Sequence, residues 1–430
     1  RGLGDVYKRQ EAIDKESHMS VAAAANPESP YKRWIVLLGL SLTYAATNGI
    51  LVHTLPLIYP QLIDEFSWTQ SQVTLPATIF LIVNALTSIP AGVLLDRLSA
   101  RMIISAGLVA IAGGLVGYAY VTELWQLVAV YTLMATGLSA CGLVSNMLIL
   151  SRWFVALRGR ATGILLMSSS AGGVVFPLVL GSLLEAGGWR SAMLYLAGIT
   201  IVIALLPMLT IVRDRPVTPE IATAPTDEEP ALKGPTVREA LTDKRFYLIA
   251  IATGAVWFTL IGMTQHQSIY LAKDMGFDAS LLPSVFSTFF AMSVVGKLLF
   301  GWLSDHFDKM LMMVASISLL AVSLIILRNV DAAGNVSLYG YAIVGGIGFS
   351  GAFTMIQLMF ANFYAGDSFG KILAILMLVD TLSGAAGTRI IALMRESAGS
   401  YFPAINLMMG LLLVAAACVL LARPRTSESA

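Results

Sequence analysis

The chain has 430 residues, of which 57% are hydrophobic and only 12% carry an acidic or basic side chain. A water-soluble core cannot bury so much apolar surface, so this composition excludes a soluble globular protein and indicates lipid as the solvent. The formal net charge of +1 gives no reason to expect a nucleic-acid partner.

The chain begins with a polar stretch that differs in composition from the apolar remainder. We interpret residues 1–18 as a non-native or disordered leader and residues 19–33 as an N-terminal tail. Neither stretch is apolar enough to cross a bilayer.

Twelve later stretches are long and apolar enough to cross a hydrocarbon layer of about 30 Å as helices. In chain order, the predicted spans are 34–59, 73–95, 102–121, 126–150, 160–182, 190–212, 245–270, 281–300, 309–328, 338–362, 371–394 and 403–422. The sequence therefore predicts an all-α integral membrane protein that has the lipid bilayer as a partner.

A proline-rich, charged stretch divides these spans into six and six. Residues 213–244 are typical of a flexible linker, and they separate an N-terminal bundle at 34–212 from a C-terminal bundle at 245–422. Residues 423–430 form a short C-terminal tail.

The two bundles repeat one another. Gly92–Arg97 after the second span resembles Gly301–His306 after the eighth, 209 positions later, and Glu185–Trp189 resembles Glu396–Tyr401, 211 or 212 positions later. Parallel six-span repeats place a substrate site between the halves, near the middle of the bilayer.

Lysine and arginine residues predict the orientation. Outside the leader, and including the residues at the ends of the spans, 17 of them lie on the side of the N-terminal tail and four on the other side. The positive-inside rule therefore puts both termini in the cytoplasm, and we expect the protein in the plasma (inner) membrane.

The loop Gly92-Val-Leu-Leu-Asp96-Arg97-Leu-Ser-Ala-Arg101 resembles the signature of the major facilitator superfamily between spans two and three. Ser99 and Ala100 depart from that signature, and the second copy follows it only in part. The resemblance implies two pseudo-symmetric six-helix bundles. It also implies that Asp96, Arg97, Arg101 and Asp305 form a conformational lock, with Asp96 set against the N-terminus of span eleven. The alternative is ordinary solvated charges at a membrane surface.

A narrower resemblance concerns the substrate. The chain is similar to monocarboxylate porters and oxalate/formate-type exchangers in Ser151–Phe154, Arg158–Gly163, Phe176-Pro177, Gly188–Arg190 and Gly399–Tyr401. It implies a small organic anion. That branch often has a lysine in span one that couples transport to protons. This chain has no lysine near the corresponding position, Asn48, so exchange of anions or proton coupling through another residue stays open.

Away from the ends of the predicted spans, three acidic or basic residues other than histidine lie inside them: Lys297, Asp380 and Arg389. A charge at the bilayer centre costs about 2.5–3.5 kcal/mol on insertion scales, so each needs a partner, a watery cavity or a route to the interface. Asp380 lies about 13 Å into its span, too deep for a short side chain to reach the interface. We interpret it as a proton carrier, with a structural carboxyl satisfied by neighbouring hydroxyls as the alternative.

Arg389 lies nine residues after Asp380, on the opposite face of the helix, so the two cannot pair, and we expect Arg389 to reach the outer interface. Lys297 has a stem long enough to snorkel. The resemblance favours a cavity role instead, because Gly296, Lys297 and Gly301 match a glycine, cation and glycine pattern in span eight of the porter branch.

Neutral polar residues and histidines inside the spans are further candidates for lining the substrate path. His266 and Gln265 belong to a polar cluster that lipid would not tolerate, although a lone histidine is more often packed and hydrogen bonded. The remaining candidates are His53, Tyr44, Asn48, Asn146 and Gln357.

Other classes of site have little support. Gly346–Gly351 fits a dinucleotide-binding pattern but lies inside an apolar span, so we interpret it, like Gly113 and Gly117, as a face for close helix packing. No nucleophile, base and orienting group are grouped as in an enzyme. No phosphate-binding loop for ATP, no metal-ligand cluster and no cofactor motif is present.

We therefore predict a secondary transporter that moves a small organic anion, coupled to protons or by exchange, with Lys297 as the anion-binding cation. An exporter of drugs or amphipathic cations is the alternative, supported by Asp380 and Trp257. A membrane sensor that does not transport is a third hypothesis, but the sequence shows no signalling domain.

Overall fold

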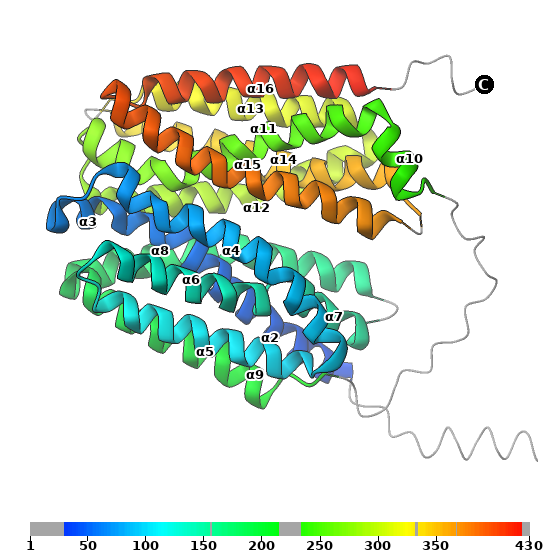
Figure 1. The fold of residues 1–430 in the computed structure, drawn as a ribbon, viewed down its shortest axis with the longest axis horizontal. Helices are drawn as coiled ribbons and strands as arrows, with labels where there is room; N and C mark the ends of the chain where they lie inside the picture. Colours follow the sequence, from blue (N-terminus) through cyan, green and yellow to red (C-terminus); the bar gives the residue numbers. More distant parts are fainter. Residues whose placement is uncertain (1–29, 155–156, 215–233, 332–333, 367, 424–430) are drawn as a thin grey trace, which may run out of the picture.

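The computed structural model describes residues 30–154, 157–214, 234–331, 334–366 and 368–423. The predicted leader, much of the N-terminal tail, most of the linker and nearly all of the C-terminal tail lie outside these residues. Helices form two bundles that lie side by side (Figure 1), an N-terminal half and a C-terminal half. We call the end at which Asp214 and Gly234 lie the linker end, and the opposite end the distal end.

The N-terminal half contains the first six predicted spans. Its elements are α2 (Pro30–Asn48), the π-helix η1 (Gly49–Thr54), η2 (Leu55–Ile58), α3 (Tyr59–Phe66), α4 (Gln70–Arg97), α5 (Ala100–Ala119), α6 (Leu124–Cys141), α7 (Leu143–Trp153), α8 (Arg158–Thr200), the π-helix η3 (Ile201–Leu205) and α9 (Leu206–Thr210).

The C-terminal half contains the other six. Its elements are α10 (Val237–Thr242), α11 (Lys244–Ile269), the π-helix η4 (Tyr270–Asp274), η5 (Ala279–Leu281), α12 (Leu282–His306), α13 (Lys309–Arg328), α14 (Asn335–Tyr364), α15 (Phe369–Ala398) and α16 (Phe402–Ala422).

The predicted number of membrane crossings is confirmed once α8 is divided. Among the described residues, eleven apolar helical runs are long enough to span a bilayer, and one of them, Arg158–Thr210, has 53 residues. At 1.5 Å per residue this run is about 80 Å long, more than twice the hydrocarbon thickness. Gly188 interrupts it with φ 73° and ψ 176°, a conformation that glycine adopts readily. The chain reverses there, so the run is two crossings and the total is twelve.

The repeat is visible in the ion pairs of the distal end. Glu65 accepts hydrogen bonds from Trp189 and Arg190, and the Arg190 guanidinium lies 4.2 Å from the Trp189 ring. Asp274, 209 positions after Glu65, accepts hydrogen bonds from Arg395 at 2.9, 3.0 and 3.2 Å. In each half, a carboxylate at the end of the first span therefore pairs with an arginine on a later helix.

A second repeat lies at the linker end. Ser99 is the N-cap of α5, and its hydroxyl donates to Asp214, which also accepts from the Arg101 backbone N–H at 2.8 Å. Asp308 is the N-cap of α13 and pairs with Arg423 at 3.4 Å. Asp308 and Arg423 lie 209 positions after Ser99 and Asp214. We call these two contacts the linker-end staples.

The predicted close-packing role of glycines holds for α14. A Cβ at Gly346 would lie 2.1 Å from the backbone oxygen of Phe289 in α12, and one at Gly351 would lie 2.5 Å from the Phe300 ring. Gly113 differs, because a Cβ there would meet nothing within 4 Å. The α14 glycines thus let α12, which carries Lys297, sit close against its own bundle.

Candidate functional site

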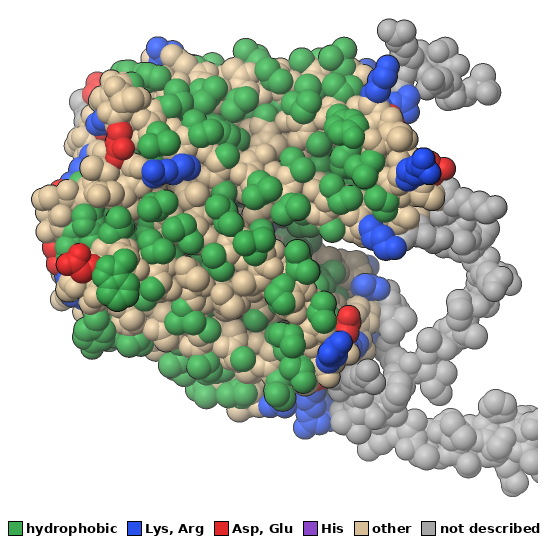
Figure 2. Space-filling model, viewed as in Figure 1, with side chains coloured by type: hydrophobic (Ala, Val, Ile, Leu, Met, Phe, Trp, Pro, Cys, Tyr) green, Lys and Arg blue, Asp and Glu red, His purple; other side chains and the backbone are tan. Residues whose placement is uncertain are grey.

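The interface between the halves is joined at the distal end and open at the linker end. Figure 2 shows the surface hollowed between the two halves at the linker end. The hydrogen bonds that join the halves near the distal end are Tyr59 to Gln265, Ser268 to Pro56, Lys273 to Asp64, Arg389 to Ser71 and Ser71 to Glu396. A solute would therefore reach the interface from the linker end in this conformation.

Two helices from opposite halves come close at the middle of this interface. A Cβ at Gly173 of α8 would lie 2.4 Å from the Phe290 ring of α12, and one at Gly181 would lie 2.8 Å from Pro283. Glycine at these positions removes the side chain that would hold α8 and α12 apart. The close approach lets polar side chains of one helix reach the other.

Lys297 of α12 makes that crossing. Its half-buried ammonium donates to the backbone oxygen of Leu166 at 3.1 Å and to the Ser170 hydroxyl at 2.7 Å, both in α8. The Ser170 hydroxyl also lies 2.9 Å from that of Ser293, one turn before Lys297. Among the described residues, these partners are all neutral, and no carboxylate forms an ion pair with Lys297. The positive charge is hydrogen bonded but not neutralised.

Aromatic rings form another wall beside Lys297. The Phe353 ring of α14 has its centroid 5.8 Å from the Lys297 ammonium, within the range of a cation–π contact. Trp257 of α11 packs edge-on against Phe353 at 6.0 Å. A cation between hydroxyls and aromatic rings can hold a ligand that combines a negative charge with a small apolar body.

His53 lies at the same interface, on the side of the N-terminal half. It belongs to the π-helix η1, an irregularity that often occurs at functional sites. Its ring lies 4.0 Å from the Phe290 ring, and its Nε2 lies 3.4 Å from the Ser169 hydroxyl. His53 and Lys297 therefore flank one short segment of α8.

Asp380 occupies a different environment. It is only 4% exposed, one of its carboxyl oxygens has no hydrogen-bond partner, and the Thr253 hydroxyl of α11 lies beside the group. Gly384 and Gly387 let α15 pack closely on α11 in the same region. Asp380 is thus buried between two helices of one half, whereas Lys297 bridges the two halves.

The polar cluster of α11 is divided among several neighbours. Gln265 accepts a hydrogen bond from Tyr59 of the other half at 2.9 Å. The His266 ring bonds to the Tyr401 hydroxyl at 3.0 Å and to the backbone oxygen of Thr388 at 2.8 Å, all within the C-terminal half. Gln265 thus faces the interface, and His266 has the placement of a packed, hydrogen-bonded histidine.

The remaining polar candidates lie on α2, α7 and α14. Asn48 donates to the backbone oxygen of Tyr44, one turn earlier, at 3.1 Å. Asn146 is buried and donates to two backbone oxygens at the break between α6 and α7, both at 2.8 Å. Gln357 is half-buried on α14, one turn after Phe353. The Asn146 amide nitrogen therefore satisfies a helix break, whereas its buried Oδ1 has no hydrogen-bond partner among the described residues.

Comparison with known proteins assigns the family. The sequence profile of the Major Facilitator Superfamily matches residues 36–282 and again residues 267–430. The chain belongs to the Major Facilitator Superfamily. It is 23% identical over 406 residues to an uncharacterized MFS-type transporter, YcxA, of Bacillus subtilis, across 91% of this chain and 93% of that protein. It is 27% identical over 274 residues to monocarboxylate transporter 11 of Homo sapiens, across 61% of this chain and 55% of that protein.

The fold of this Major Facilitator Superfamily chain is also found in solved structures. A bacterial homologue of the human lysosomal transporter Spinster, in an inward-facing and unoccupied conformation, aligns with a TM-score of 0.74 at 18% identity. The alignment covers 92% of this chain and 98% of that one. The predicted architecture of two six-helix bundles is thereby confirmed.

The superfamily's signature loop lies at the open end of the interface. Asp96 and Arg97 at the end of α4, and Asp305 near the end of α12, are exposed. Among the described residues, Asp96 forms no hydrogen bond or ion pair with α15. Arg101 instead turns into its own half, where its guanidinium donates to the backbone oxygens of Met208 and Leu209 in α9.

Arg389 of this Major Facilitator Superfamily chain lies at the closed end of the interface. Its guanidinium donates to the backbone and hydroxyl oxygens of Ser71 in the first turn of α4, and Glu396 accepts the Ser71 N–H at 3.1 Å. Sequence reasoning missed Ser71 and Ser170, the partners of Arg389 and Lys297. The available signal was that a cation inside a membrane span needs a hydrogen-bond acceptor.

Proposed function

We propose that this Major Facilitator Superfamily protein is a secondary transporter of small organic anions resembling monocarboxylates, working by alternating access. The substrate would bind between the halves near Lys297, with Ser170, Phe353 and His53 around it. Further residues proposed to line the path are Gln265, Asn48, Tyr44 and Gln357. This proposal is consistent with the similarity to monocarboxylate transporter 11.

One observation carries the proposal. The Lys297 ammonium is half-buried and lies where the two halves meet, and within the part of the chain that the structure describes its hydrogen bonds go to neutral oxygens only. A cation removed from water is costly without a counter-charge, and a substrate carboxylate would supply one. The neighbouring aromatic rings would cover the apolar part of a small carboxylate.

We further propose that Asp380 couples transport to protons. A buried carboxyl with one unpartnered oxygen can gain and lose a proton as the helices around it move. Exchange of one anion for another is the alternative, because an exchanger does not need to release that proton.

The open side is proposed to be the cytoplasmic side. Most of the described lysine and arginine residues lie at the linker end, including Arg158 and Arg160 at the start of α8, and the positive-inside rule places such an end in the cytoplasm. In that orientation Asp96, Arg97, Arg101 and Asp305 would act on the cytoplasmic gate.

An exporter of amphipathic cations is the second candidate. It is favoured by the buried Asp380 and by Trp257. Trp257, however, packs on the ring that faces the Lys297 ammonium, so a second cation there would meet repulsion. We therefore prefer the anion.

Counterflow in proteoliposomes tests both candidates, because it reports binding and translocation without assuming a driving ion. Vesicles holding the full chain are loaded with one compound from a panel of small mono- and dicarboxylates and amphipathic cations, and uptake of its labelled form is followed. We expect counterflow with at least one carboxylate. Counterflow with amphipathic cations and with no carboxylate would overturn the anion assignment.

A further inference from the structure

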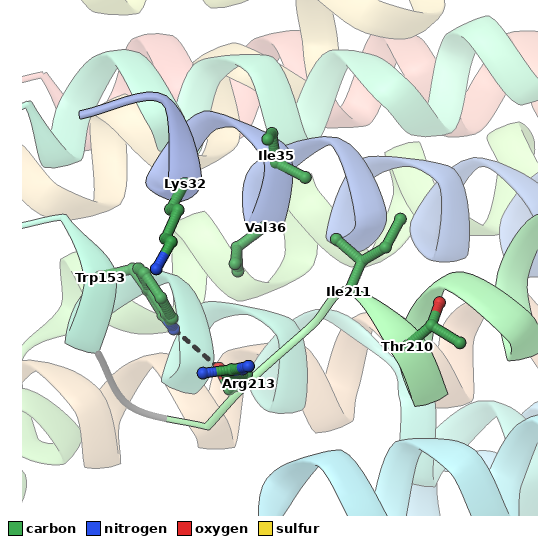
Figure 3. Close-up of a pocket in the computed structure, with 7 residues that line it drawn as sticks. All are labelled: Lys32, Ile35, Val36, Trp153, Thr210, Ile211 and Arg213. Atoms are coloured by element: carbon green, nitrogen blue, oxygen red, sulfur yellow. Dashed lines mark hydrogen bonds between the residues drawn. The ribbon is translucent and has the colours of Figure 1, made fainter. Parts of the chain in front are cut away.

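A cavity lies away from the interface, at the linker end of the N-terminal half (Figure 3). Its volume is about 240 Å³. It is bounded by the first turns of α2, the end of α7 and the turn that follows α9, and its lining residues are Lys32, Ile35, Val36, Trp153, Thr210, Ile211 and Arg213. None of these residues takes part in the proposed anion site.

Two cations and an indole form the polar side of the cavity. Figure 3 shows the Lys32 side chain extending from α2 toward Trp153, with Arg213 beyond the indole. The Trp153 Nε1 donates to the Arg213 backbone oxygen at 2.7 Å, which fixes the turn that carries the guanidinium. The carboxylate of the adjoining Asp214 accepts hydrogen bonds from the Ser99 hydroxyl and the Arg101 backbone N–H, and Asp214 is not among the residues that line the cavity.

The other side of the cavity is apolar and faces outward. Ile35 is 46% exposed and Ile211 is 37% exposed, and both lie within one or two turns of a helix end. In a membrane-spanning bundle, exposed isoleucines at that level contact lipid chains, and the cations beside them lie at the depth of the headgroups.

The repeat separates Arg213 from the linker-end staples. The residue 209 positions after Arg213 is Ala422, directly before the stapled Arg423. The C-terminal half thus has no cation at the position equivalent to Arg213, and its Arg423, one residue later, pairs with Asp308. Arg213 is therefore not part of the repeated staple, and its side chain lines the cavity.

We propose that this cavity binds the phosphate of an anionic phospholipid, with Lys32 and Arg213 on the phosphate and the acyl chains over Ile35 and Ile211. The guanidinium supplies a planar pair of donors suited to a phosphodiester, and the ammonium adds a point charge. Lys32 and Arg213 would bind a free phosphate through the same contacts as a lipid phosphate. The outward-facing isoleucines favour the lipid, because they can cover its acyl chains.

Native mass spectrometry of the full chain tests the proposal, with phosphatidylglycerol and phosphatidylcholine as probes. We expect Lys32→Gln with Arg213→Gln to weaken retention of phosphatidylglycerol about tenfold or more, since each cation contributes about 1 kcal/mol near an anionic surface. Retention of phosphatidylcholine should not change. Arg158→Gln with Arg160→Gln is the matched control, because it removes the same charge from the same end and neither residue lines the cavity.

Three results would overturn the proposal. If both double variants lost retention of phosphatidylglycerol equally, the lipid would be held by diffuse surface charge. If the cavity variant retained phosphatidylglycerol as wild type does, the lipid would bind elsewhere. Displacement of phosphatidylglycerol by inorganic phosphate at millimolar concentration would assign the cavity to free phosphate. Thermal stability measured for both variants in phosphatidylcholine alone separates lost binding from lost folding.

Discussion

The Lys297 ammonium and the Ser170 hydroxyl are hydrogen bonded at 2.7 Å across the boundary between the two halves. The donor belongs to α12 and the acceptor to α8, so the bond must break or be remade when the halves move apart. An anion that replaced Ser170 as the acceptor of the Lys297 ammonium would remove a contact between the halves. Differential contacts of this kind are what a substrate needs to shift a conformational equilibrium.

Lys297→Gln should weaken substrate affinity roughly tenfold to hundredfold. The substitution leaves a buried carboxylate without its charged donor, which costs on the order of 1–3 kcal/mol. Lys297→Arg keeps the charge and should retain part of the activity. Ser170→Ala is the control, because it removes the neighbour and keeps the ammonium, so affinity should fall by less than in Lys297→Gln. Equal affinity in wild type and Lys297→Gln, measured by binding to correctly inserted protein, would refute the anion site.

Asp380→Asn should abolish accumulation driven by a pH gradient and spare exchange of labelled for unlabelled substrate. The amide cannot carry a proton, whereas exchange does not require its release. Both activities are measured in proteoliposomes. Asp278→Asn, which changes an exposed carboxylate, serves as control and should leave both intact. Normal pH-driven uptake in Asp380→Asn would leave Asp380 as a structural residue.

Asp96→Asn should lower turnover and change substrate affinity little. In the conformation open at the linker end Asp96 is exposed, so its charge is expected to act in the opposite, closed conformation and not on the ligand. Initial transport rates and substrate binding are measured on the same preparation. An unchanged rate in fully inserted protein would remove Asp96 from the proposed lock.

Arg389→Gln should shift the chain toward the conformation that is open at the distal end. Arg389 binds Ser71 of the other half, and a hydrogen bond from a charged donor contributes about 1.5–3 kcal/mol, enough for a tenfold or larger change in population. Electron paramagnetic resonance distances between spin labels at Thr122 and Ser280, both exposed near the distal end, report the opening.

Arg395→Gln is the matched control for that experiment. Arg395 pairs with Asp274 inside the C-terminal half, so its loss should not lengthen the distance between the halves. If both variants lengthen the distance alike, the opening comes from general loosening of the distal end, and the role assigned to Arg389 is wrong.

The spans were predictable from sequence because hydropathy changes sharply at their ends. The predicted span 309–328 coincides with α13, which starts after the cap at Asp308 and ends at a charged residue. The break at Gly142 was not predicted, since the sequence is apolar on both sides of it. The reversal at Gly188 was predicted as a gap between spans, although the helical hydrogen bonding continues through it.

The candidate site was less predictable, because its residues meet only after the halves pack. Lys297 and Asp380 stood out as charges in apolar segments. Ser170 did not, since it belongs to a run of small residues that is typical of helix packing. His266 was equally conspicuous in sequence, but its neighbours Thr388 and Tyr401 come from α15 and the turn before α16, and only the tertiary structure shows that they satisfy it.

The linker-end staples have opposite polarity in the two halves. In the N-terminal half an acidic residue after the last span binds near Arg101, and in the C-terminal half a basic residue binds Asp308. If the halves exchanged these tails during membrane insertion, Asp214 would meet Asp308 and Arg423 would meet Arg101. Like charges would then oppose both exchanged contacts. The opposite charges of the two tails would therefore favour assembly of each bundle with its own tail.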